Sequence, residues 1–261
     1  MSESPLVQLQ RQDHVAWLVL NRAEARNALS LETLRQFRRH CAALRQDPEI
    51  WAVAITGTGD RAFCAGADLK ERRTFTEEQV REFVQQIRGT MDDIAALPQP
   101  TLAVLNGAAF GGGCEMALAC DLRVMDESAS IGLTETSLAI IPGAGGCVRL
   151  PRLVGAARAK ELILLASRLD AARALEIGLV NFLAAQGQAR AKGEEILQTL
   201  LRNGPLALQA AKAAVDGAMD LPVEQALAYE FNCYQRIIPT EDRLEALAAF
   251  AEKRPPRFQG R

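Results

Sequence analysis

Short apolar runs alternate with stretches of helical periodicity through the first part of the sequence. Val15–Leu20 is an apolar run that ends at Asn21, and apolar residues recur at helical spacing after Ser30. Serine is a residue type that commonly caps the N-terminus of a helix. Strands that alternate with helices predict an α/β fold. The predicted strands are residues 15–20, 51–56, 101–105 and 121–125, and the predicted helices are 31–44, 76–97 and a short helix from about Gly113.

From Lys160 onward, the sequence consists of Ala- and Leu-rich segments with short breaks. Both residue types favour helices, and neither a fixed-period repeat nor a low-complexity linker is visible. We therefore expect an α/β core over residues 1–195 and a helical region over residues 196–261. The predicted helices of this part are residues 159–166, 171–177, 189–202, 205–219, 222–237 and 241–253.

The composition excludes several classes of protein. The net charge of −2 argues against a general nucleic-acid-binding protein, because affinity for phosphates is built mainly from cationic contacts. No apolar stretch approaches the length of a membrane span, and residues 1–5 lack the features of a signal peptide. We therefore expect a cytoplasmic protein. The six cysteines are scattered without a CxxC spacing, which predicts buried, reduced thiols.

Histidine is rare in this chain, which contains only His14 and His40. This shortage argues against a histidine-based catalytic triad and against a multi-histidine metal site. We expect no metal ion and no separate cofactor. A catalytic site would have to use carboxylates, backbone dipoles or cysteine.

Three segments rich in small residues could carry chemistry, namely 63–70, 106–115 and 132–146. Each joins a strand-like run to a turn or a helix. Small residues let a substrate approach backbone N–H groups closely, and a helix that begins there adds its dipole. Two such N–H groups that converge on one oxygen form an oxyanion hole, which stabilises an enolate.

Other interpretations of these residues remain open from the residues alone. The glycines at 111–113 precede Cys114 and Glu115 rather than Lys-Ser/Thr, so they do not form a phosphate loop, and GxGxxG is also absent from a first βαβ unit. Glu115 could simply complement the dipole of a first helical turn, and Glu135 could be a solvated loop acid. Cys114 has no histidine nearby in sequence, which favours packing over a nucleophilic role.

The order and spacing of these motifs resemble those of the crotonase (enoyl-CoA hydratase/isomerase) superfamily, and the resemblance covers nearly the whole chain. Each motif is weak alone, whereas their combination is specific. The matching residues are NR (21–22), NAL (27–29), FCAGADLK (63–70), NG (106–107), GGGCE (111–115), CD (120–121), Glu135, IPGAGG (141–146) and FAEKR (250–254).

The resemblance implies a crotonase-type spiral of ββα turns with a helical C-terminal region that forms trimers and covers the active site. The protein would then be a homotrimer or homohexamer that binds an acyl-CoA thioester. The backbone N–H groups of Ala67 and Gly112 would bind the thioester oxygen, and Lys253 would lie near the CoA phosphates. The residues implied to contact substrate or CoA are Ala65, Ala67, Asp68, Leu69, Lys70, Gly111, Gly112, Phe250 and Lys253.

Two glutamates decide which reaction of the superfamily is expected, because one oxyanion hole serves several reactions. Hydratases of the family have glutamate at both acidic positions, and this chain has Glu115 and Glu135 there. Two carboxylates can hold one water, so that one accepts its proton while the other supplies a proton to C2 of the substrate. We assign Glu115 mainly to the water and Glu135 mainly to proton delivery, although paired carboxylates titrate as a unit.

Several stretches resemble the branch that contains 3-methylglutaconyl-CoA hydratase of leucine breakdown, including a member that binds AU-rich RNA. A substrate with a distal carboxylate would favour a cation at the acyl end of the site, and Arg72 and Arg73 are candidates. The helix predicted at 31–44 carries Arg35, Arg38 and Arg39, which are more typical of a solvated face than of an RNA site. The alternatives are a Δ3,Δ2-enoyl-CoA isomerase and a non-enzymatic RNA-binding protein.

Overall fold

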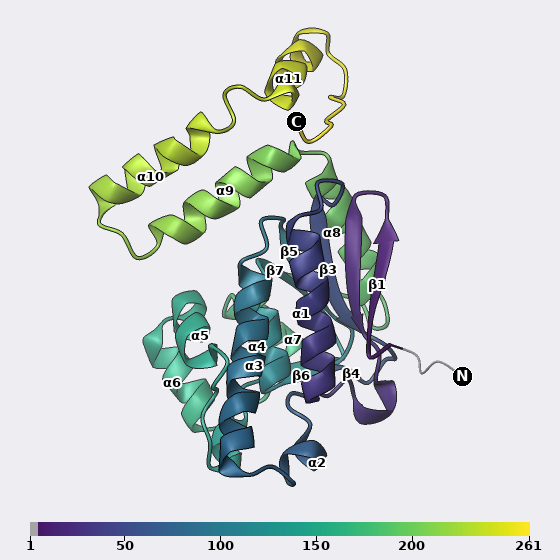
Figure 1. The fold of residues 1–261 in the computed structure, drawn as a ribbon, viewed down its shortest axis with the longest axis vertical. Helices are drawn as coiled ribbons and strands as arrows, with labels where there is room; N and C mark the ends of the chain where they lie inside the picture. The colour runs from purple at the N-terminus through teal and green to yellow at the C-terminus, as the bar shows by residue number, and fades with distance from the viewer. Residues whose placement is uncertain (1–4) are drawn as a thin grey trace.

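The computed structural model describes residues 5–261, whose strands form two sheets (Figure 1). Residues 1–4, which belong to the segment that lacks the sequence features of a signal peptide, lie outside the described residues. The larger sheet has the strand order β1-β2-β3-β5-β7-β10. Its strands are β1 (Val7–Gln12), β2 (Val15–Leu20), β3 (Ala52–Gly57), β5 (Thr101–Leu105), β7 (Leu122–Asp126) and β10 (Phe182–Ala184).

The larger sheet is parallel except at one edge. β2, β3, β5, β7 and β10 pair in parallel, and β1 pairs with β2 as an antiparallel hairpin partner. β2, β3 and β5 are buried along their whole length, which is the environment in which parallel strands consist of continuous apolar residues. The predicted strands therefore agree closely with the structure, and those at 15–20 and 101–105 match it residue for residue.

The second sheet has the order β4-β6-β8-β9 and lies beside the first. Each long strand β3, β5 and β7 is followed by one short strand of this sheet and then by a helix, which gives the repeated ββα turns of a crotonase-type spiral. β4, β6 and β8 are parallel, and β9 is antiparallel to β8. The short strands are β4 (Ala62–Cys64), β6 (Ala108–Phe110), β8 (Ser130–Gly132) and β9 (Leu169–Asp170).

The helices begin at the caps that the residue types favour. The Ser30 side chain accepts the Thr33 N–H as the N-cap of α1, and Thr76 and Gln79 form a reciprocal capping box on α3. The helices are η1 (Ala23–Ala25), α1 (Leu31–Arg45), α2 (Leu69–Arg72), α3 (Glu77–Ala95), α4 (Gly112–Ala119), η2 (Glu135–Leu138), α5 (Gly146–Val154), α6 (Ala156–Leu164), α7 (Ala171–Glu176), α8 (Ala189–Leu201), α9 (Pro205–Ala218), α10 (Val223–Gln235) and α11 (Glu241–Ala251).

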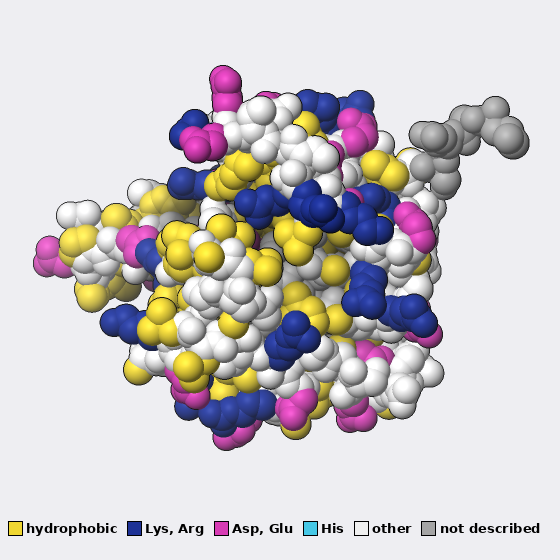
Figure 2. Space-filling view, turned by 90° about the horizontal axis from the view of Figure 1, so that it is seen from below, with side chains coloured by type: hydrophobic (Ala, Val, Ile, Leu, Met, Phe, Trp, Pro, Cys, Tyr) yellow, Lys and Arg dark blue, Asp and Glu magenta, His cyan; other side chains and the backbone are white. Residues whose placement is uncertain are grey.

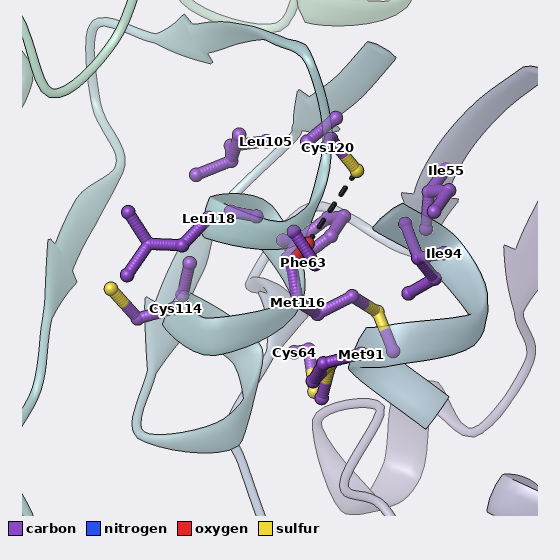
Figure 3. Packing of buried hydrophobic residues seen from close by; sticks show 14 of the residues in the cluster. Ile55, Phe63, Cys64, Met91, Ile94, Leu105, Cys114, Met116, Leu118 and Cys120 are labelled. Atoms are coloured by element: carbon purple, nitrogen blue, oxygen red, sulfur yellow. Dashed lines mark hydrogen bonds between the residues drawn. The ribbon is translucent and has the colours of Figure 1, made fainter. Parts of the chain in front are cut away.

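The main core lies between the two sheets and the helices α1, α3 and α4 (Figure 3). The side chains of Met116 in α4 and of Cys120, which directly follows α4, lie among residues of α3 and of the strands in this cluster. All six cysteines are free, as expected, and five are buried. Cys147 contradicts the prediction of uniformly buried thiols, because it lies in the first turn of α5 on an exposed side.

The helical C-terminal part extends away from the core (Figure 1). α8 still packs on the larger sheet, where Ile196 and Leu197 join a second buried cluster. The boundary expected after residue 195 falls inside this helix, so the part that leaves the core begins at α9. An ion pair joins α9 to the core, because Lys212 Nζ lies 2.7 Å from Asp121 Oδ2. Among residues 5–261, no helix combines the length and apolar character needed to cross a membrane.

Candidate active site

A cavity of about 990 Å³ opens on the side of the molecule where α2 and the start of α4 lie. Its wall is mostly apolar, and basic side chains border a hollow on this face (Figure 2). An apolar cavity with a few convergent polar groups is the usual form of a small-molecule site. Its lining includes Ala65, Gly66, Ala67, Leu69, Gly111, Gly112, Glu115, Thr134, Glu135 and Ser137, together with apolar residues of α3 and of the segment after η2.

Two free backbone amides lie next to each other in this cavity. Ala67 follows β4 and Gly112 begins α4 after β6, and β4 and β6 are parallel neighbours. A Cβ added to Gly112 would lie 3.7 Å from the Ala67 nitrogen, so the two amides are close. Within residues 5–261, neither N–H donates to a protein acceptor. The pair has the composition of an oxyanion hole.

Glycine is needed where these two turns meet. Gly66 has φ +91, and a Cβ there would lie 2.7 Å from the Phe110 carbonyl oxygen. Gly113 packs against β4 so closely that a Cβ would overlap the carbonyl oxygen of Cys64. The glycines therefore let the first turn of α4 lie directly on β4, which brings Ala67 and Gly112 together.

Glu115 lies in the first turn of α4 and is 3% exposed. Its Oε1 accepts the N–H of Ala144 at 2.7 Å and the N–H of Gly146 at 2.9 Å. Burial raises the pKa of this carboxyl, while the two N–H groups and the nearby Arg149 charge oppose the rise. Both donors engage Oε1, so Oε2 is not held by them.

Glu135 is the first residue of η2 and is 8% exposed. Its Oε2 is buried without a hydrogen-bond partner, and its Oε1 lies 3.3 Å from where a Gly111 Cβ would be. Burial, followed by the charge of Glu115, raises the pKa of Glu135 to about 7. This carboxyl therefore loses its proton only as the pH rises through about 7, where an ordinary glutamate is already ionised.

The two glutamates thus line one cavity with different surroundings. Glu115 has two N–H donors that favour its ionised form, whereas Glu135 has none from other residues and faces a like charge. Environments that push two carboxyls toward different protonation states separate the roles of base and acid. The arrangement can accept one proton and deliver another beside the two free amides.

Most of the predicted contact residues line this cavity in the structure, but some of them do not. Ala65, Ala67, Leu69, Gly111 and Gly112 line it together with both glutamates. Neither Asp68 nor Lys70 is among the lining residues. Asp68 caps α2 and pairs with Arg22 at 3.0 Å, and the Lys70 side chain is exposed.

Phe250 and Lys253 lie at the opposite end of the molecule, in and just after α11 (Figure 1). Phe250 is 85% exposed. Within one chain, the region 196–261 contributes no residue to the cavity lining, so it does not cover the site there.

Several lining residues were missed by the sequence analysis. Arg72 lines the cavity as anticipated, whereas Arg73 does not, and Arg26 and Arg168 line it without having been predicted. The apolar lining of α3 has helical spacing and could have been found from that pattern. These α3 residues are Val80, Phe83, Val84 and Ile87.

Cys114 is a packing residue. It is 1% exposed, and burial raises the pKa of its thiol well above the ordinary value, with the charges of Glu135 and Glu115 adding to this. A nucleophilic cysteine needs its thiolate, which these surroundings disfavour. Among the described residues, no group of three or more His, Cys, Asp or Glu could hold a metal ion.

A spiral of ββα turns that sets two free amides beside a buried glutamate pair defines a crotonase-type α/β protein. A family model described as enoyl-CoA hydratase/isomerase matches residues 10–261, and the chain belongs to this family. It is 45% identical to human mitochondrial methylglutaconyl-CoA hydratase over 247 residues, which cover 93% of this chain and 73% of the human protein.

Two further relatives agree with this assignment. Over 248 residues the chain is 44% identical to mouse mitochondrial enoyl-CoA hydratase domain-containing protein 2, covering 94% of this chain and 84% of that one. The crystal structure of an enoyl-CoA hydratase from Bacillus anthracis superposes with a TM-score of 0.96 at 46% identity, covering 98% of this chain and all (100%) of that one.

Proposed function

We propose that this protein is an enoyl-CoA hydratase, a hydro-lyase that adds water reversibly across the C2–C3 double bond of a 2-enoyl-CoA. One observation carries the proposal: Glu115 and Glu135 line the same cavity as the free amides of Ala67 and Gly112. Two backbone N–H groups and the charge of Arg149 oppose the rise in the pKa of the buried Glu115, whereas burial and the charge of Glu115 raise the pKa of Glu135 to about 7.

The proposed reaction uses all four groups. The N–H groups of Ala67 and Gly112 bind the thioester oxygen, which makes C3 electrophilic. Glu115 takes a proton from water, and the hydroxyl oxygen forms a bond to C3 as the double-bond electrons move toward the thioester oxygen. Glu135 then gives its proton to C2, so the product has gained one water. The coenzyme A portion of the substrate is the only cofactor-like group that this reaction uses.

The largest contribution to rate is expected from the amides. Loss of one oxyanion donor costs ~2.7–4 kcal/mol of barrier in enzymes that stabilise an oxyanion in this way. General acid–base catalysis by each carboxyl contributes roughly 10²–10⁴-fold. We assign both contributions to this cavity because the two amides and the two carboxyls all line it.

The hydratase proposal is tested by following the absorbance of the conjugated enoyl thioester of crotonyl-CoA. We expect it to fall with the wild type and to remain nearly unchanged with Glu115→Gln and Glu135→Gln. The exposed Glu127→Gln is the matched control. Failure of the wild type to add water while crotonyl-CoA still binds would reject the proposal. Formation of a 2-enoyl-CoA from a 3-enoyl-CoA, with no hydration, would instead support the isomerase alternative.

Three arginines in the lining support an anionic substrate. Arg26, Arg72 and Arg168 form no ion pair within residues 5–261. Arg72 lies 5.9 Å from the centre of the Phe83 ring, and Arg168 lies 4.8 Å from that of Phe110. Their charges suit both the phosphates of coenzyme A and a carboxylate at the acyl end.

We further propose 3-methylglutaconyl-CoA, an intermediate of leucine degradation, as the substrate. The support is the unpaired arginines together with the similarity to human methylglutaconyl-CoA hydratase. A kinetic panel of crotonyl-, longer-chain and 3-methylglutaconyl-CoA tests this. We expect Arg72→Met and Arg168→Met to lower kcat/KM selectively for the dicarboxylic substrate, with Arg73→Met as control. A preference for crotonyl-CoA over 3-methylglutaconyl-CoA would reject this substrate.

We also propose that the chain assembles as a homotrimer or homohexamer through its C-terminal helices. α9 and α10 expose many large apolar side chains, among them Val223, Phe231 and Tyr234 at 75%, 60% and 62% exposure. Apolar surfaces of this extent mark interaction sites. Assembly would also allow Phe250 and Lys253 to reach the cavity of another copy. Light scattering of the purified protein tests this, and a monomer at micromolar concentration would contradict it.

RNA binding is not part of the proposal. On α1, Arg38 pairs with Asp93 at 2.7 Å and Arg39 pairs with Glu32 at 3.2 Å. Of the three arginines considered on this helix, only Arg35 has no ion pair within residues 5–261, and a single free cation offers little to a row of phosphates.

A further inference from the structure

Arg149 lies directly behind the segment that holds Glu115. This residue belongs to α5, and its side chain is 21% exposed. Its Nη1 donates to the carbonyl oxygen of Ala144 at 3.0 Å, and its Nη2 donates to Asp92 Oδ1 at 2.9 Å. Asp92 belongs to α3, the helix that supplies the apolar wall of the cavity.

The same segment supplies both hydrogen bonds to Glu115. Ala144 donates its N–H to Glu115 Oε1 and receives Arg149 at its own carbonyl oxygen. Gly146 donates the second N–H. A chain of polar contacts therefore runs from Asp92 through Arg149 and Ala144 to Glu115.

Gly145 makes room for this guanidinium. Gly145 has φ +105, and a Cβ on it would overlap Arg149 Nη1. The backbone therefore bends around the guanidinium at Gly145. The N–H groups of the two neighbouring residues, Ala144 and Gly146, both point to Glu115. A guanidinium is planar and has several N–H donors, so it can bind the Ala144 carbonyl oxygen and the Asp92 carboxylate at the same time.

We infer that Arg149 is the positioning residue for Glu115, fixing the 144–146 backbone so that Glu115 Oε1 is held and Oε2 remains available to water. This inference rests on the proposed hydratase function. Arg149 does not line the cavity, so it acts through the backbone. A displaced base lowers the rate of the chemical step more than substrate binding, because near-attack geometry is lost.

The pH dependence of turnover distinguishes this role from general support of the fold. The titratable groups around Glu115 are Glu135 of η2, Arg149 of α5, and the thiols of Cys114 and Cys147. Loss of the Arg149 charge and of the fixed N–H groups makes the ionised Glu115 less favourable. The acidic limb of the kcat profile should then move to higher pH.

Kinetics of Arg149→Gln, Arg149→Lys and Asp92→Asn with crotonyl-CoA test the inference. The control is Arg152→Gln, one turn away, where an exposed arginine pairs with Asp220. We expect Arg149→Gln to lower kcat by roughly 10- to 100-fold while KM changes by less than about threefold. Arg149→Lys should recover part of kcat, and Asp92→Asn should lose less than Arg149→Gln.

Each outcome bears on the inference. If Arg149→Gln folds but has the kcat and pH profile of Arg152→Gln, Arg149 does not position Glu115. If Arg149→Gln does not fold, unchanged kcat and pH profile in both Arg149→Lys and Asp92→Asn overturn the inference in the same way. A wild type that adds no water to crotonyl-CoA rejects the proposed function instead, which separates the two failures.

Discussion

Replacing Glu135 with glutamine should increase stability at alkaline pH while it removes activity. Burial and the neighbouring charge of Glu115 raise the pKa of Glu135 from 4.5 to about 7 in the folded protein. The pKa of Glu135 is higher in the folded protein than in the unfolded chain, so the protonated carboxyl favours the folded state and the ionised carboxyl does not. That contribution is complete below about pH 4.5 and is lost as the pH rises through about 7.

The magnitude follows from the two pKa values. Between pH 5 and pH 8, ionisation of Glu135 should lower the free energy of unfolding of the wild type by about 2–3 kcal/mol relative to Glu135→Gln. For a chain of this size, that corresponds to a difference of about 5–10 °C in unfolding midpoint. The pH dependence of the difference is the measured quantity, because glutamine also leaves a polar atom buried.

Thermal unfolding of the wild type and of Glu135→Gln at pH 5 and pH 8 measures this effect. The exposed Glu127→Gln serves as the control. A difference in midpoint between wild type and Glu135→Gln that is the same at both pH values would refute the argument that Glu135 is destabilised when ionised. Loss of turnover in the same variant would show that the site retains this unfavourable carboxyl for its chemistry.

Three further changes test the packing around the site and the C-terminal helices. Gly113→Ala would drive a Cβ into the Cys64 carbonyl, so we expect little folded protein in a solubility and unfolding assay, and a normal midpoint would contradict the packing. Lys212→Met leaves Asp121 without its cation, and the free energy of unfolding should fall by less than the ~3–5 kcal/mol expected for a fully buried pair. Denaturant unfolding measures this change, and an unchanged free energy of unfolding would mean that the pair does not hold α9 on the core. Leu227→Asp on the exposed side of α10 should reduce the mass measured by light scattering, whereas an unchanged assembly would exclude that side from the interface.

The long strands could be predicted because burial on both faces demands continuous apolar residues. β2 and β5 are of this kind, and their ends match the predictions. β4, β6 and β8 have three residues each and consist largely of small residues, so no periodicity marks them. The edge strand β1 alternates polar and apolar residues over only Val7–Gln12 and was also missed.

The site could be predicted in its residue types and less well in its contacts. Glu115, Glu135, Ala67 and Gly112 were named from motifs, and all four line the cavity. The donors to Glu115 lie 29 and 31 residues away in the chain, and their bonds depend on how α4 and α5 pack. Arg168 belongs to no motif, so only the fold reveals it.

The placement of the two free amides has a consequence for how enzymes of this architecture diverge. Any residue other than proline at position 67 or 112 still supplies a backbone N–H, so mutation seldom deletes the two amides that we propose bind the thioester oxygen. Glu115 and Glu135, in contrast, act through side chains that one codon change can remove. If the amides bind acyl thioesters as proposed, a lineage can lose or relocate a proton-transfer group and still bind the same class of substrate, so that a new reaction can begin from an intact binding site.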